Sequence, residues 1–179
     1  MLDATTALVM PDLATPAGWL PIVFVLVMAL AMLAYVIMDG YDLGVGVLLR
    51  RADNEAQKDS MIASIGPFWD ANETWIVLGV GILLIAFPQA HGLVLTALYL
   101  PVTLMLMGLI LRGVSFDFRV KAGDKHKAKW NALFALGSLV ASVSQGWMLG
   151  AFVTGLTGDA TNTLFAALIA LALPALYIM

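Results

Sequence analysis

The sequence predicts an all-α fold, a polytopic bundle of about five transmembrane helices with its N-terminus outside the cytoplasm. Composition is the first observation: 61% of the 179 residues are hydrophobic and 12% are charged, about half the charged fraction of a soluble domain. A soluble fold would need a polar surface that this composition cannot supply. The second observation is a series of apolar stretches long enough to cross a bilayer. The third is that all nine basic residues fall in two segments between those stretches.

The first span is predicted over residues 19–49. Trp19 to Met38 contains no charged residue, and at ~1.5 Å per helical residue this stretch matches the ~30 Å hydrocarbon core of a bilayer. The apolar pattern then continues past two aspartates to Leu49, which leaves both aspartates within the membrane. No Lys or Arg precedes the stretch, so the basic region of a cleavable signal peptide is missing. We therefore expect this segment to remain in the mature protein as a transmembrane span.

Four further spans follow from the same criterion, over residues 61–87, 93–111, 130–154 and 162–179. Pro88 to Gly92 is interpreted as a tight connection, since Pro and Gly interrupt regular structure, and residues 112–129 are interpreted as the longest polar loop. Residues 1–179 are expected to form a single transmembrane domain. The last apolar run reaches Met179 without a polar end, so we expect this span to be truncated and more spans to follow in a longer polypeptide.

The basic residues predict the orientation of the spans. Three of them lie in residues 50–58 and six in residues 112–129. Loops rich in Lys and Arg stay on the cytoplasmic side of a membrane. Both segments are therefore predicted to be cytoplasmic, and the N-terminus and the turns at 88–92 and 155–161 are predicted to lie outside.

Acidic residues within the predicted spans are unusual, because an ionisable side chain there costs several kcal/mol unless it meets protein, water or a partner. They form two pairs, Asp39 with Asp42 and Asp70 with Glu73, and each pair is three residues apart, on one face of its helix. Measured from the cytoplasmic loop between the first two spans, the pairs lie ~12 to 16 Å and ~18 to 22 Å along antiparallel helices. The four carboxyls are therefore predicted to converge.

Three interpretations of these acids remain open. With Asn72 and Gln145 nearby, they can form a hydrogen-bonded proton relay that is open to the cytoplasm. They can instead bond neighbouring helices and only hold the bundle together, as in a purely structural subunit. Buried carboxyls in a helix bundle also serve proton-coupled transporters, which is the alternative from another functional class.

Other residue types limit the chemistry of the chain. It has no cysteine, which excludes disulfides and thiolate sites within it. His91 and His126 fall in predicted loops, where neither can act as a buried haem ligand, and no metal site is predicted. The glycines at 40, 44 and 46 are expected to serve close helix packing. The lysines at 121–129 are interpreted as a topology signal that contacts lipid headgroups, rather than as a nucleic-acid site.

Three segments resemble subunit II of cytochrome bd-type quinol oxidases. They are MDGYDLGVGVLLR at 38–50, SIGPFWDANETWIVLGVG at 64–81 and LRGVSFDFR at 111–119. All three occur in the family's order, and the resemblance covers about residues 18–179. Phe68 before the Trp-Asp pair and Glu73 after Asn72 are closer to the cyanide-insensitive branch.

The resemblance implies a respiratory complex of the bacterial inner membrane that oxidises quinol and reduces dioxygen to water. A larger subunit I would carry the haems, two of b type or one of b type with haem d, while subunit II carries none. Membrane lipids, quinone and a small accessory subunit are the further partners it implies. The family's subunit II has two similar halves of four helices, so this chain would cover the first half and the start of the second.

The resemblance also implies roles for individual residues. Asp39 and Asp42 match the Asp-Gly-aromatic-Asp motif, and Trp69 and Asp70 match the Trp-Asp pair, which are linked to a proton path from the cytoplasm. From its place in the second acidic pair, rather than from the resemblance, Glu73 is a further candidate for that path. Three residues of the last segment are expected to form only an ion-pair cluster at a loop: Arg112, Asp117 and Arg119.

Overall fold

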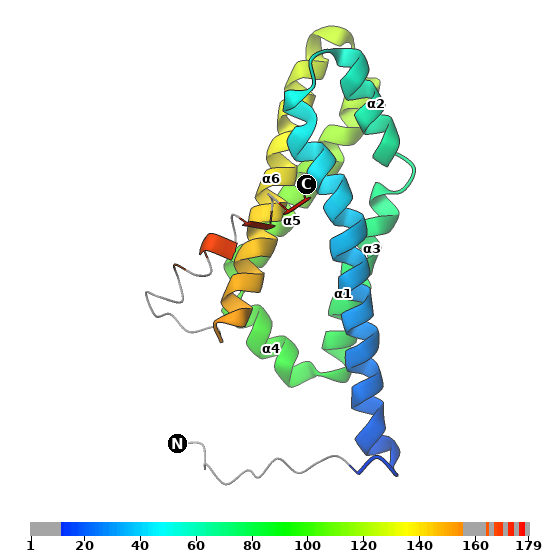
Figure 1. The fold of residues 1–179 in the computed structure, drawn as a ribbon, viewed down its shortest axis with the longest axis vertical. Coiled ribbons are helices and arrows are strands. Elements are labelled where there is room, and N and C mark those ends of the chain that lie inside the picture. Colours follow the sequence, from blue (N-terminus) through cyan, green and yellow to red (C-terminus); the bar gives the residue numbers. More distant parts are fainter. Residues whose placement is uncertain (1–11, 156–163, 165–166, 170–171, 174–175, 178–179) are drawn as a thin grey trace.

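The computed structural model describes residues 12–155, 164, 167–169, 172–173 and 176–177. Within this part of the chain the regular structure is helical and contains no strand (Figure 1). The helices are α1 (Pro16–Leu48), η1 (Leu49–Arg51), α2 (Glu55–Ile65), α3 (Trp69–Ala86), α4 (Pro88–Ala97), α5 (Tyr99–Lys121) and α6 (Asp124–Val153).

Four of these helical segments are long and apolar enough to cross a membrane: Pro16–Arg51, Trp69–Ala86, Tyr99–Lys121 and His126–Val153. This confirms the predicted all-α, polytopic bundle. The fifth predicted span, 162–179, falls mostly on residues outside the described part of the chain. The orientation of the bundle in the membrane stays a prediction.

The second span is shorter than predicted because residues 61–87 do not form one helix. Residues 61–65 end the polar helix α2, which begins where the Asn54 side chain accepts a hydrogen bond from the backbone N–H of Gln57 at 2.9 Å. Gly66 still has helical dihedral angles, but Pro67 lacks the backbone N–H that would continue the helical hydrogen bonds. The chain therefore breaks after α2, and α3 begins at Trp69.

The third span also begins later than predicted. Pro88 and Gly92 were expected to make a tight turn, but Pro88 is the first residue of α4, where its missing N–H and fixed φ suit a helix start. Gly92 is accommodated within that helix. The membrane-spanning helix α5 begins only at Tyr99, so the prediction of a span from residue 93 was wrong.

The predicted polar loop 112–129 was wrong as well, because almost all of it is helical. α5 continues to Lys121 and α6 begins at Asp124, which leaves two residues between them. Arg119 and Lys121 occupy the last turn of α5, where positive charge is favourable against the helix dipole. Hydropathy alone ends a span at its first charged residue, whereas this helix extends well past Arg112.

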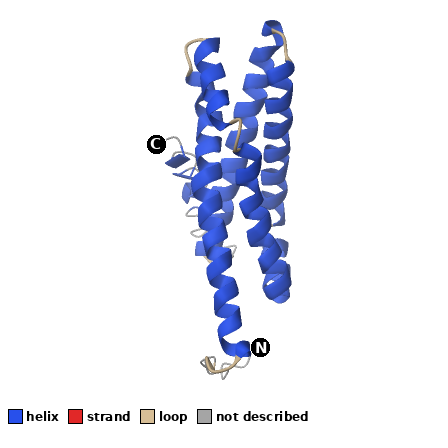
Figure 2. Cartoon of the chain, turned by 90° about the vertical axis from the view of Figure 1, so that its right-hand side faces the viewer, coloured by secondary structure: helices blue, strands red, loops and turns tan. Residues whose placement is uncertain are grey.

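The helices form two packed pairs that run along the long axis of the molecule (Figures 1 and 2). α5 packs on α6, α1 packs on α3, and α1 also contacts α6. At the α5–α6 contact, a Cβ built on Gly108 would lie 2.8 Å from the carbonyl oxygen of Gly137, and one built on Gly137 would lie 2.7 Å from that of Gly108. Two glycines therefore let these backbones approach closely.

Two hydrophobic clusters fill the space between the helices. The first joins α2 to the adjoining ends of α1, α5 and α6 through Leu49, Ile62, Ile65, Phe116 and Phe134. The second lies deeper in the bundle and consists of Leu43, Met105, Leu109 and Ala141. On α5, Arg112 lies between Phe116 of the first cluster and Leu109 of the second.

Candidate functional site: a buried cluster of acids around Arg112

Asp39 and Asp42 are buried in the core of the bundle. Their exposed fractions are 0% and 1%, and both lie in the last third of α1, whose helical period turns them to the same side. Gly40, between them, is also buried, because the ring of Tyr177 fills the space that a Cβ would need. The prediction that small residues on this helix serve close packing is confirmed at Gly40.

Arg112 is the counter-ion of the cluster. It is 1% exposed, and its Nη2 lies 2.8 Å from Oδ1 of Asp39 and 2.6 Å from Oε1 of Glu73. The single guanidinium thus joins α1, α3 and α5. The expectation that Arg112 belongs to a loop ion-pair cluster was wrong, since α5 carries this residue into the core.

Trp69 covers the guanidinium from the start of α3. The centre of the Arg112 guanidinium lies 5.8 Å from the indole centroid, within the range of a cation–π contact. The indole also packs on Phe116, with 5.2 Å between ring centroids. Trp69 therefore belongs to the wall of the cluster, and its ring shields the positive charge.

Asp42 has an uncharged partner and a side open to a cleft. Nδ2 of Asn72, a residue predicted nearby, donates a hydrogen bond of 2.8 Å to Oδ2 of Asp42. A cleft of about 260 Å³ reaches both side chains between α1 and the α2–α3 break, and Ser64 and Phe68 are among its other lining residues. Asp42 is therefore buried but lines a cleft at the side of the bundle.

Asp70 does not join the other three acids. It is exposed and lies in the first turn of α3, where the helix dipole favours a negative charge. Glu73 follows it by three residues and is only partly buried, with a side-chain exposure of 24%. Of the four carboxyls predicted to converge, the structure brings together those of Asp39, Asp42 and Glu73, which with Arg112 we call the acidic cluster.

Some polar atoms of the acidic cluster have unused bonding capacity. Oδ2 of Asp39 and the Nε and Nη1 atoms of Arg112 are buried and lack a hydrogen-bond partner within the part of the chain that the structure describes. Buried polar atoms in proteins are nearly always bonded to protein or to ordered water. These atoms can therefore accept or donate further hydrogen bonds, as a hydrated relay requires.

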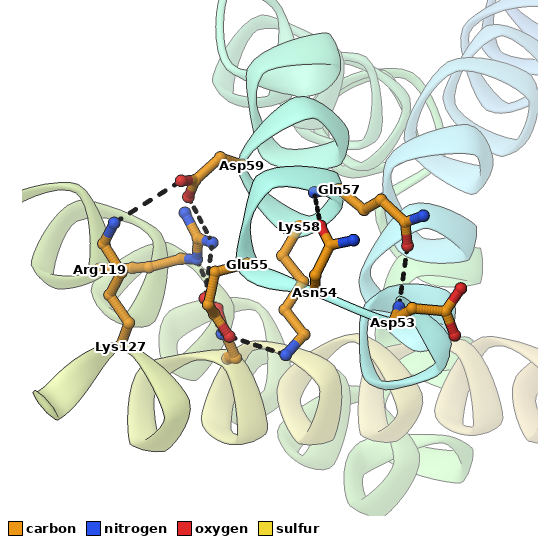
Figure 3. A network of polar contacts seen from close by, with 9 residues as sticks. Asp53, Asn54, Glu55, Gln57, Lys58, Asp59, Arg119 and Lys127 are labelled. Atoms are coloured by element: carbon orange, nitrogen blue, oxygen red, sulfur yellow. Dashed lines mark hydrogen bonds and ion pairs between the residues drawn. The ribbon is translucent and has the colours of Figure 1, made fainter. Parts of the chain in front are cut away.

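A second polar network lies at the end of the bundle where α2 sits (Figure 3). Arg119 lies 2.8 Å from Asp59 and 3.8 Å from Glu55, and its Nε donates to the side chain of Asn131. Lys127 lies 3.6 Å from Asp59. We call these five residues the α2 ion-pair cluster, because they bind α2 to α5 and α6. Arg119 was thus correctly expected in an ion-pair cluster, although it lies on a helix and is buried.

Neighbouring cations change the acidity of the two carboxyls in the α2 ion-pair cluster. The hydrogen bond from Lys58 is the main cause that lowers the pKa of Glu55. The hydrogen bond from Arg119 does the same for the pKa of Asp59. Both acids are about half exposed, so solvent screens these contacts and each contributes little to stability.

The two histidines of the chain lie outside the acidic cluster. His91 lies on α4 and His126 in the first turn of α6, so both are on helices rather than in the predicted loops. His126 is exposed and His91 is only half buried. Within the described residues, no group of three or more His, Cys, Asp or Glu side chains is arranged to hold a metal ion.

A bundle of membrane-spanning helices with three acids and one arginine in its core defines a class, the integral membrane proteins that keep ionisable groups within the bilayer. Comparison with known proteins identifies the family within that class. The chain belongs to the family of cytochrome bd terminal oxidase subunit II, whose model matches residues 20–179.

Curated relatives agree with this family. The chain is 34% identical over 145 residues to cytochrome bd ubiquinol oxidase subunit 2 of Bacillus subtilis, which covers 80% of this chain and 43% of that protein. It is 30% identical over 132 residues to cytochrome bd-I ubiquinol oxidase subunit 2 of Escherichia coli K12, covering 73% and 35%. A probable cytochrome oxidase subunit 2 of Haemophilus influenzae is 32% identical over 123 residues, covering 67% and 32%. The resemblance found in the sequence is confirmed, and the chain spans less than half the length of these relatives.

Proposed function

We propose that this chain is part of a haem-free subunit II of a bacterial cytochrome bd-type quinol oxidase in the inner membrane. In this proposal it stabilises a larger, haem-bearing subunit I and contributes acids to a proton path from the cytoplasm. Quinol and dioxygen are the substrates of the complex. The family and the names of the relatives support this proposal. A partner as the holder of the haems is supported by His126, which is exposed, and by His91, which is only half buried.

The observation that carries the proton path is the imbalance of charge in the core. Three acids, Asp39, Asp42 and Glu73, surround one arginine, so three carboxylates would leave net negative charge in a region that water reaches poorly. Burying an uncompensated charge costs several kcal/mol. A proton held among the three carboxyls lowers the net negative charge and so reduces this cost, and such a proton can be exchanged.

The geometry suggests the order in which the residues act. Asp70 is exposed one turn before Glu73 and would collect protons at the surface of the chain. Glu73 and Asp39 share Arg112, while Asp42 faces the cleft beside Asn72. Trp69 would keep the guanidinium in place, because its ring covers that group.

The alternatives from the sequence predict different outcomes. Membership of an oxidase family removes the reason to prefer a proton-coupled transporter. The interpretation of the acids as purely structural predicts that replacing one of them damages assembly. The proton-path interpretation predicts that it slows turnover in an assembled complex.

Turnover of the purified complex tests the proposal. Asp42→Asn keeps an acceptor for Asn72 but cannot carry a proton, and Asp70→Asn removes the surface acid. We expect both variants to lower quinol-driven oxygen uptake, Asp42→Asn by roughly tenfold or more, with an unchanged reduced-minus-oxidised haem spectrum. Ser144→Ala is the matched control, since among the described residues its buried hydroxyl bonds only the carbonyl of Val140.

Two results would overturn this proposal in different ways. Full turnover in Asp42→Asn would contradict the proposed proton path. Loss of the haem bands would favour a structural role for the acids. A colourless preparation of the wild-type chain without a larger partner would return the transporter to consideration.

A further inference from the structure

A line of hydrogen bonds between three uncharged side chains lies beside Asp39. Nε2 of Gln145 on α6 donates to the hydroxyl oxygen of Tyr35 on α1 at 2.6 Å. The hydroxyl of Tyr177 donates to Oε1 of the same amide at 2.8 Å. The Tyr35 hydroxyl lies beside the carboxyl of Asp39, four residues further along the same helix. The proton path proposed above leaves Tyr35, Gln145 and Tyr177 without a function.

The direction of these hydrogen bonds follows from the donors and acceptors. Tyr177 fixes the orientation of the Gln145 side-chain amide, because its hydroxyl donates a hydrogen bond to the amide oxygen. The amide nitrogen then faces Tyr35, so the Tyr35 oxygen accepts a hydrogen bond and its own hydrogen remains free to donate. The acceptor beside it is the Asp39 carboxyl, whose Oδ2 has no partner among the geometric hydrogen bonds of the described residues.

The packing keeps this line in place. Tyr35 is 2% exposed and Gln145 is 8% exposed. The Tyr177 ring rests on Gly40, where a Cβ would lie 2.5 Å from its Cε1 atom. The three side chains therefore occupy a fitted space beside Asp39 and have little freedom to turn away.

The line is unsuited to carry protons further. A carboxamide neither gains nor loses a proton near neutral pH, so a proton that reaches Tyr35 has no acceptor beyond it. In contrast, a hydroxyl that donates to a carboxylate fixes its orientation and stabilises its charged form.

We propose that Tyr35, Gln145 and Tyr177 are positioning residues that orient the Asp39 carboxyl toward Arg112 and close the inner end of the proton path. This inference rests on the proposed function, because it assumes that Asp39 exchanges protons. In this inference Asp39 exchanges them on the side of Arg112 and Glu73, and not on the side of Tyr35. The other ionisable groups around Asp39 come from three elements, and α6 contributes only the uncharged amide of Gln145. They are Asp42 on α1, Glu73 on α3 and Arg112 on α5.

The pH profile of turnover tests this role in the complete oxidase complex. Tyr35→Phe removes the hydroxyl beside Asp39, so the carboxyl is no longer held in one orientation. We expect the pH profile of turnover to shift by about one pH unit from that of the wild type, which corresponds to a tenfold change in a proton equilibrium. The haem spectrum should stay unchanged. Tyr177→Phe keeps the ring on Gly40 and should give a smaller shift in the same direction.

Two further variants separate the possible failures. Ser144→Ala, on α6 beside Gln145, should keep the wild-type profile. Asp39→Asn should lower turnover and abolish the acid limb; if it changes neither, the proposed proton path fails and this inference fails with it. If Asp39→Asn has its effect but both tyrosine variants keep the wild-type profile, the positioning role alone is overturned.

Discussion

Arg112 determines whether the acids of the core can coexist. Its Nη2 is shared by Asp39 and Glu73, and the whole side chain is buried. A buried ion pair adds little net stability, but removing one partner leaves the other charge without compensation. The role of Arg112 is therefore to make a site of several acids tolerable in the membrane.

Replacement of Arg112 tests this role. Arg112→Gln should destabilise the fold by about 3 to 5 kcal/mol, because Asp39 and Glu73 lose their counter-ion. Arg112→Lys should be intermediate, since an ammonium keeps the charge but not the planar donor geometry. The thermal stability of the detergent-purified complex measures the effect. Arg51→Gln, at an exposed position of η1, is the control, and equal stability of the two Gln variants would contradict the account.

The acids of the core could be predicted from the sequence, but their counter-ion could not. Asp39, Asp42 and Glu73 stand out because charged residues are rare in apolar stretches, and the helical period aligns them. Arg112 lies 73 residues from Asp39 in sequence, and it follows an apolar run directly, so hydropathy assigned it to a loop. Arg112 and Arg119 are seven residues apart, so a continuous helix turns both to one face. This spacing was the signal in the sequence that the helix continues.

At the scale of elements, the contact of α5 with α6 positions Arg112. A Cβ on Gly137 would lie 2.8 Å from the backbone nitrogen of Arg112 as well as 2.7 Å from the oxygen of Gly108. These neighbours are backbone atoms, which cannot turn aside as a side chain can. The two helices must separate to admit any larger residue.

Gly137→Ala should therefore destabilise the complex by about 1 to 3 kcal/mol, the usual cost of overpacking. The thermal midpoint of the purified complex measures this. Gly92→Ala is a matched control, because Gly92 is also helical and has no atom within 4 Å of its Cβ position. If both variants lower the midpoint equally, close packing of α5 on α6 is not the cause.

The ion pairs of α2 make a small contribution to its stability that responds to acid. The folded-state pKa values of Glu55 and Asp59 lie below their ordinary values, so their contribution is complete above about pH 4.5. It is lost as the pH falls through the lowered folded-state values. The amide hydrogens of α2 should therefore lose protection from exchange below about pH 4, after correction for the intrinsic exchange rate.

Asp59→Asn supplies the comparison for α2. This variant should show weaker protection of α2 at neutral pH and a smaller loss on acidification, because one of the two titrating groups is gone. Protection that does not depend on pH in the wild type would show that Ile62 and Ile65, buried in the first hydrophobic cluster, hold α2 by themselves.

The ends of the elements were harder to predict than their existence. Apolar composition located four spans, but polar α2 and short α4 were hidden in predicted spans and turns. The helix start at Pro88 and the break at Pro67 both involve proline, and the difference depends on which backbone N–H groups need a partner. Composition alone does not carry this information.

At the scale of the molecule, the apolar side chains left exposed fit a membrane. Leu26, Leu30 and Ile37 on α1 are each more than 60% exposed, as lipid-facing or partner-facing residues would be. Because the number of candidate spans is even, four, the start of α1 and the end of α6 lie on the same side of the membrane. The basic residues predict that the connections after α1 and α5 are cytoplasmic.

Introduced cysteines can test this orientation, because the natural chain has none. Gly123→Cys lies between α5 and α6, and Gln89→Cys lies on α4; both positions are exposed. In intact cells with a permeable outer envelope, a membrane-impermeant maleimide should label residue 89 but not residue 123 until the membrane is opened. The reverse labelling pattern would show that the bundle has the opposite orientation. The cleft at Asp42 would then lie on the wrong side of the membrane for a cytoplasmic proton source.

The proton path is tested most directly by proton uptake of the reduced complex when it is mixed with oxygen, comparing the wild type with Asp42→Asn. We expect uptake to slow by roughly tenfold or more in the variant, while the haem spectrum and the amount of subunit I stay the same. Unchanged uptake with intact haems would contradict the account and leave the acidic cluster as a structural feature of the bundle.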